Sequence, residues 1–89
     1  MKHNRELLKT AIIAKLENKR HAQNAAKYVI GKLDESKADL ASFETLVDAC
    51  VTFAKIQVSI AELRDENRML AKSAKRLTRE VEMRANLNH

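Results

Sequence analysis

The side chains able to do chemistry are few, and their spacing is that of helices rather than of an active site. Glu17 and His21 lie four residues apart and would share one face of a helix, as two metal ligands can. No second Glu–His element accompanies them, so we expect neither a metal site nor a cofactor. Cys50 lies within apolar sequence without a base at helical spacing, which is typical of a buried small hydrophobic residue.

Three carboxylates cluster on one turn, at Glu62, Asp65 and Glu66. Arg64 and Arg68 are adjacent, and ordinary pairing between residues three or four apart explains the cluster. The sequence also lacks a glycine-rich phosphate loop, a CxxC pair and a Ser-His-Asp set. We therefore expect a protein that is not an enzyme and has no catalytic residues.

Between residues 67 and 79 the chain has five cations and no acidic residue: Arg68, Lys72, Lys75, Arg76 and Arg79. Such a cluster could contact nucleic-acid phosphates or an acidic protein surface, although a solvated helix face is the simpler interpretation. Leucine-zipper transcription factors place their basic region before the zipper, whereas these cations lie beside the heptads. Base stacking of the RNA-binding kind is not supported, because no aromatic residue is near.

Two series of residues recur every seven positions and predict a coiled coil over 56–81. The d positions are Ile56, Leu63, Leu70 and Leu77, and the a positions are Ile60, Asn67, Ala74 and Val81. We call these eight residues the seam. Asn67 is its only polar member; paired with its counterpart in a parallel dimer, it would fix the register. A homodimer is therefore expected, with a monomeric bundle that covers the seam as the alternative.

The composition predicts an all-α fold, because the 89 residues contain no proline and a single glycine, Gly31. Helical spacing of apolar residues predicts a first helical segment over 4–33, either one helix or two with a kink near 18–21. Residues 34–36 are expected to form the turn, with Ser36 capping the next helix. Nothing then stops a second helix over 37–85, which would be about 73 Å long at 1.5 Å per residue.

The charges are arranged in three blocks. Residues 1–33 have eight Lys/Arg and two Glu, residues 34–66 have three Lys/Arg and eight Asp/Glu, and residues 67–89 have six Lys/Arg and two Glu. The net charges of +6, −5 and +4 predict that the first two blocks pair as an antiparallel helical hairpin. A basic cluster (Lys15, Lys19, Arg20, His21 and Lys27) would then face the acidic block. Residues 67–89 would have no partner within the chain.

We interpret residues 1–89 as a single helical domain of an intracellular, cytoplasmic protein. One cysteine favours a reducing compartment, no uninterrupted apolar segment follows the basic residues 1–6, and the longest apolar run, 11–14, is far too short for a membrane span. Small size and dense charge are typical of accessory proteins of phages and mobile elements, which suggests a dimeric adaptor, regulator or inhibitor of an unidentified protein partner. The alternative is a nucleic-acid-binding protein that uses the five cations.

Overall fold

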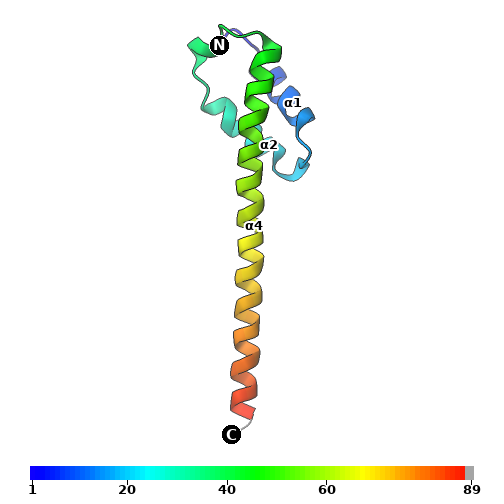
Figure 1. Ribbon diagram of the computed structural model, residues 1–89, viewed down its shortest axis with the longest axis vertical. Coiled ribbons are helices and arrows are strands. Elements are labelled where there is room, and N and C mark those ends of the chain that lie inside the picture. Colours follow the sequence, from blue (N-terminus) through cyan, green and yellow to red (C-terminus); the bar gives the residue numbers. More distant parts are fainter. Residues whose placement is uncertain (88–89) are drawn as a thin grey trace.

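The computed structural model describes residues 1–87, and within them only helices are found. Their bounds are α1 (Arg5–Lys15), α2 (Lys19–Gly31), α3 (Glu35–Ala38) and α4 (Phe43–Leu87). Helix α4 runs the length of the molecule, and the others gather around its first half (Figure 1). The molecule is 72 Å long, and its radius of gyration is 20.8 Å, against about 12 Å for a compact chain of this size. The all-α hairpin with a long helix is confirmed.

A break at residues 16–18 divides the first arm, so the single helix over 4–33 is wrong and the two-helix alternative holds. Leu16 has an extended backbone (φ −90°, ψ 133°), and its side chain is buried. Asn18 then begins α2 as its N-cap, accepting a hydrogen bond from the Arg20 amide at 3.0 Å. The Lys19 ammonium donates to the Ile13 carbonyl at 2.7 Å, which satisfies one of the free carbonyls at the end of α1.

The long helix begins at Phe43, six residues later than predicted, and continues to Leu87. The short helix α3 intervenes, and it is capped by Asp34 rather than by Ser36. A turn through residues 39–42 follows. Ser42 then caps α4, because its hydroxyl accepts a hydrogen bond from the Thr45 amide at 3.2 Å.

The second helix is the arm that pairs antiparallel with α4. His21, early in α2, contacts Asp65, whereas residues near the end of α2 lie beside Leu46 at the start of α4. Helix α1 instead runs in the same direction as α4: His3 contacts Ala41, and Asn18, just after α1, contacts Glu62. The chain therefore folds down, up and down again, giving three helices side by side (Figure 1).

The core lies where α1 and α2 meet the first half of α4. Its buried residues are Leu8, Ile12, Leu16, Ala22, Ala25, Ala26, Val29, Ala38, Leu46, Val47, Cys50, Val51, Ala54 and Val58. Alanines make up much of the α2 face, which allows α2 and α4 to approach closely. Alanine removes little apolar area from water, however, so the core is modest for the number of residues in it.

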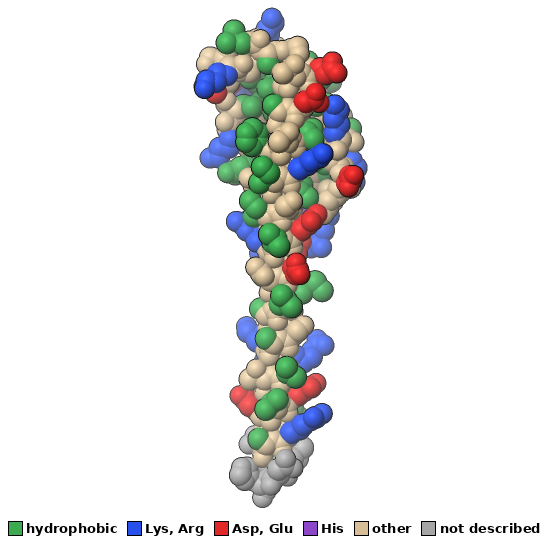
Figure 2. All heavy atoms as spheres, viewed as in Figure 1, with side chains coloured by type: hydrophobic (Ala, Val, Ile, Leu, Met, Phe, Trp, Pro, Cys, Tyr) green, Lys and Arg blue, Asp and Glu red, His purple; other side chains and the backbone are tan. Residues whose placement is uncertain are grey.

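Two parts of the molecule differ sharply. We call the first the head; it contains α1, α2, α3 and α4 as far as Asp65. We call residues 66–87 of α4 the rod, and every side chain from 66 to 85 is exposed. Figure 2 shows the head as a thick body and the rod as a single helix, with hydrophobic side chains continuing along one face of both.

Candidate functional site

The seam is exposed along its whole length. Leu63, Leu70 and Leu77 are 59%, 60% and 62% exposed, and no helix of the described chain covers the seam. The alternative, a monomeric bundle in which the first arm covers the seam, is therefore not found in the structure. Regularly spaced leucines on one face of a bare helix are typical of a surface that another helix covers.

The same apolar face continues into the head, which sequence reasoning did not recognise. Phe53 lies seven residues before Ile60 and is 62% exposed, and Ala49, also exposed, lies seven before Ile56. The heptad spacing was available as a signal. It was hidden because apolar residues occur all around α4 over 40–63, and the sequence alone does not show which of them face α1 and α2.

The five predicted contact cations all lie exposed on the rod. In heptad terms they occupy positions b, c and f, away from the seam. Within residues 1–87, none of the five forms an ion pair with a carboxylate. Figure 2 shows Lys and Arg side chains on both flanks of the hydrophobic face of the rod. The arrangement is an apolar stripe with cations beside it.

The second basic cluster largely contacts the acidic block within the chain, as predicted. Lys15 pairs with Asp48 at 3.1 Å, and Asp65 receives both His21 Nε2 at 2.7 Å and Arg20 at 3.6 Å. The hydrogen bond with His21 lowers the pKa of Asp65, with Arg20 and Arg68 adding to the effect. The Lys15–Asp48 pair joins the end of α1 to α4, and the contacts of Arg20 and His21 with Asp65 join the start of α2 to α4 at the lower edge of the head.

His21, four residues after Glu17, does not form a metal site with it. The imidazole bonds to Asp65 on α4 rather than converging with Glu17, which lies in the break before α2. No group of three or more potential metal-ligating side chains is present among residues 1–87. The pair therefore has a structural explanation as a helix-to-helix contact.

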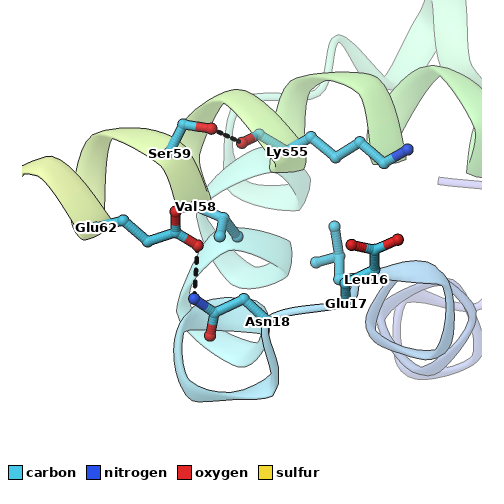
Figure 3. A pocket seen from close by; sticks show the side chains of 7 residues that line it. All are labelled: Leu16, Glu17, Asn18, Lys55, Val58, Ser59 and Glu62. Carbon is cyan, nitrogen blue, oxygen red and sulfur yellow. Dashed lines mark hydrogen bonds between the residues drawn. The ribbon is translucent and has the colours of Figure 1, made fainter.

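A shallow pocket of about 340 Å³ lies beside this contact, between the α1–α2 break and α4 (Figure 3). Asn18 points toward Glu62 and donates a hydrogen bond to it at 2.6 Å, while Lys55 extends away from them. The Ser59 hydroxyl donates a hydrogen bond to the backbone carbonyl of Lys55 at 3.0 Å, not to a side chain that could act as a base. The Asn18–Glu62 hydrogen bond therefore attaches the α1–α2 break to α4, and Ser59 is not activated as a nucleophile.

Cys50 is buried in the core as expected, with 1% of its surface exposed. Burial raises the pKa of its thiol, which keeps the sulfur in the unreactive thiol form. Its role in the head is therefore that of a small apolar side chain.

No protein-family model, curated protein or solved structure matches this chain. Of the described helices, none combines the length and the apolar character that crossing a membrane requires.

Proposed function

We propose that this chain is a non-enzymatic helical binding protein that dimerises through the seam and acts by occupying the surface of a protein partner, as an adaptor, regulator or inhibitor. The observation that carries the proposal is the exposed seam, an apolar stripe on a helix with no partner in the chain. Water contact with such a stripe is unfavourable, and association removes it. We place the dimer in a reducing, intracellular setting, with a phage or mobile-element accessory role as the biological context.

Dimerisation is tested by sedimentation equilibrium of the full chain at tens of micromolar. We expect the mass of a dimer, because helices in proteins owe most of their stability to packing of an apolar face, and the exposed seam has no such packing within the described chain. A monomeric mass at that concentration would contradict the proposal.

The protein partner is expected to present an acidic surface to the five rod cations, which are exposed and without a carboxylate partner in the described chain. Affinity capture from a nuclease-treated lysate should retain a protein that is lost when all five cations are changed to glutamine. A control variant, Lys27→Gln with Lys55→Gln, changes two exposed cations of the head and should retain that protein. Equal capture by both variants would exclude the rod as the contact surface.

The second candidate function is binding to nucleic-acid phosphates, and the same five exposed cations favour it. Phosphate binding releases counterions, so affinity should fall by about 10³-fold or more between 50 and 200 mM salt if a dimer uses six or more cations. A mobility-shift titration over that salt range, with mixed DNA and RNA, measures this. If no shift is seen at physiological salt, nucleic-acid binding is excluded and only the protein-binding proposal remains.

A further inference from the structure

A groove opens in the head beside the seam, between α4 and the end of α2 with α3. Its volume is about 550 Å³. Tyr28, Leu33, Ala38, Leu46, Ala49 and Phe53 line it, and most of its surface is apolar. Tyr28 is 51% exposed and also lines a second, smaller hollow further down α4 with Ile60 and Arg64.

The groove and the seam are one surface. Phe53 continues the a positions backward from Ile60, and Ala49 continues the d positions backward from Ile56; Leu46, one heptad before Phe53, is already buried in the head core at the end of the groove. An α-helix that covers the seam would therefore run directly into the groove. The two stripes on α4 lie on different faces: one contacts α1 and α2, and the other is left bare from Phe53 to Val81.

We propose that the occupant of this surface is α4 of a second copy, packed parallel and in register, so that Tyr28 of each copy contacts α4 of the other. The proposal rests on the dimer of the proposed function. It adds the participation of α2 in the interface and argues the parallel direction that Asn67 suggests in the sequence.

Asn67 argues for a second copy in parallel. In an antiparallel pair, a residues face d residues, and the d positions of the seam are Ile56, Leu63, Leu70 and Leu77. The amide of Asn67 would then face an apolar side chain without a hydrogen-bonding partner, which is unfavourable. In a parallel pair it faces the same amide of the other copy.

The remaining seam residues bear on the number of helices. Among parallel coiled coils, leucine at d with isoleucine or valine at a favours two strands, and the seam has leucine at three of four d positions and isoleucine and valine at two a positions. Side-by-side alignment brings the basic rods together. Their cations occupy the outer positions b, c and f, however, where solvent screens charges separated by more than about 8 Å at physiological salt.

Tyr28 is positioned to contact the partner because α2 lies on one flank of the seam. That flank carries the e position Gln57, which lines both the groove and the smaller hollow with Tyr28. In a parallel pair, e residues face g residues of the other helix. The g positions in the head are short side chains, Thr45, Thr52 and Ser59, which leave room for an aromatic ring.

The direction is tested by disulfide trapping. In a Cys50→Ala background, Val81→Cys adds the only thiol, at an a position. A parallel pair should oxidise rapidly to a covalent dimer, whereas an antiparallel pair separates the two thiols by roughly 38 Å at 1.5 Å per residue. The matched control is Arg79→Cys, an outer position that should form little disulfide.

The outcomes separate the two proposals. Rapid trapping at 81 but not at 79 supports the parallel pair. A dimeric mass without trapping at 81 overturns the direction but leaves the dimer of the proposed function intact. A monomeric mass overturns both.

The role of Tyr28 is tested through its own fluorescence, because the chain has one tyrosine and no tryptophan. Dilution of the wild-type protein should change the emission in step with dissociation measured by sedimentation. Tyr28→Ala should weaken dimerisation roughly tenfold or more, as loss of an aromatic anchor does. Leu7→Ala, an exposed apolar residue of α1, should leave the dissociation constant unchanged; equal constants for both variants would remove Tyr28 from the interface.

Discussion

The two halves of α4 both carry apolar side chains, but these side chains have different surroundings. In the head, α4 buries Leu46, Val47, Cys50, Val51, Ala54 and Val58 against α1 and α2. In the rod, Leu70, Leu77 and Val81 are equally apolar and remain exposed. The same helix is thus stabilised within the chain at one end and has no described intrachain contact at the other.

The comparison teaches that the spacing of apolar residues differs between the part of α4 that packs within the chain and the part that is left exposed. Head residues occupy adjacent helical positions and form a broad face, which suits two neighbours. Rod residues are restricted to two positions in seven, which suits one. The predictions below alter the seam or the contacts of the head.

The largest effect is expected from the double change Leu63→Glu and Leu70→Glu. Two charges within the seam should abolish dimerisation, because each would be buried without a partner. The rod should then lose helix, since most of the stability of a helix in a protein comes from packing of its apolar face. Sedimentation and hydrogen exchange should show a monomer with an unprotected rod and a protected head.

The matched control for that variant is Met69→Glu with Met83→Glu. Both methionines are exposed on α4 but lie at c positions, outside the seam. The control should remain dimeric. A dimer in the seam variant would mean that the rod does not associate through the seam.

A change confined to the head core should have a large effect on stability. Ile12 is fully buried, and Ile12→Ala should lower the free energy of unfolding by about 2–5 kcal/mol, as core truncations do. Leu7→Ala, on the same helix but 62% exposed, should change it by no more than about 0.5 kcal/mol. Urea unfolding at constant protein concentration measures both, and similar losses would contradict the assignment of the core to this face of α1.

Replacing the polar residue of the seam should raise stability, whereas the preceding changes lower it. Asn67→Leu should raise dimer stability by about 1–3 kcal/mol, because the buried amide no longer has to be desolvated. It should also loosen the choice of oligomer, since leucine does not restrict the pairing as Asn does. Sedimentation velocity should then show species larger than a dimer, whereas a strictly dimeric variant of unchanged stability would place Asn67 outside the interface.

The sequence predicted the helical class well because it depends on repeated local signals, whereas the pairing of the seam with another helix stays a prediction. The absence of proline favours long helices, and the seven-residue spacing needs no tertiary information. The break at Leu16–Asn18 was placed less well, because an N-capping asparagine is a weak signal until the packing of two short helices against α4 is known. The start of α4 was predicted too early because α3 and the turn through Leu40 contain neither glycine nor proline.

The groove in the head could not be predicted from local patterns. Tyr28 and Phe53 are twenty-five residues apart in the chain and lie near each other only because α2 folds back along α4. The antiparallel pairing of the first arm was likewise correct only for α2, since the break turns α1 to run with α4. Long-range direction depends on where helices end, and helix ends are the weakest local signals.

The smallest effect is expected at the lower edge of the head, where Asp65 joins α2 to α4. Its pKa is lowered below 3.8 by the hydrogen bond with His21 and by Arg20 and Arg68. The folded protein therefore releases this proton more readily than the unfolded chain. The resulting stabilisation is complete at neutral pH and is lost as the pH falls through 3.8 toward the lowered pKa.

Asp65→Asn should remove that part of the acid dependence and slightly lower stability at pH 7. Some acid dependence should remain, because the hydroxyl of Ser36 also lowers the pKa of Asp34. Urea titrations at several pH values between neutrality and pH 3 measure the slope, with Glu66→Gln, the exposed neighbouring carboxylate on the rod, as the control. Equal slopes in the two variants would show that the contact at Asp65 contributes nothing to the attachment of α2.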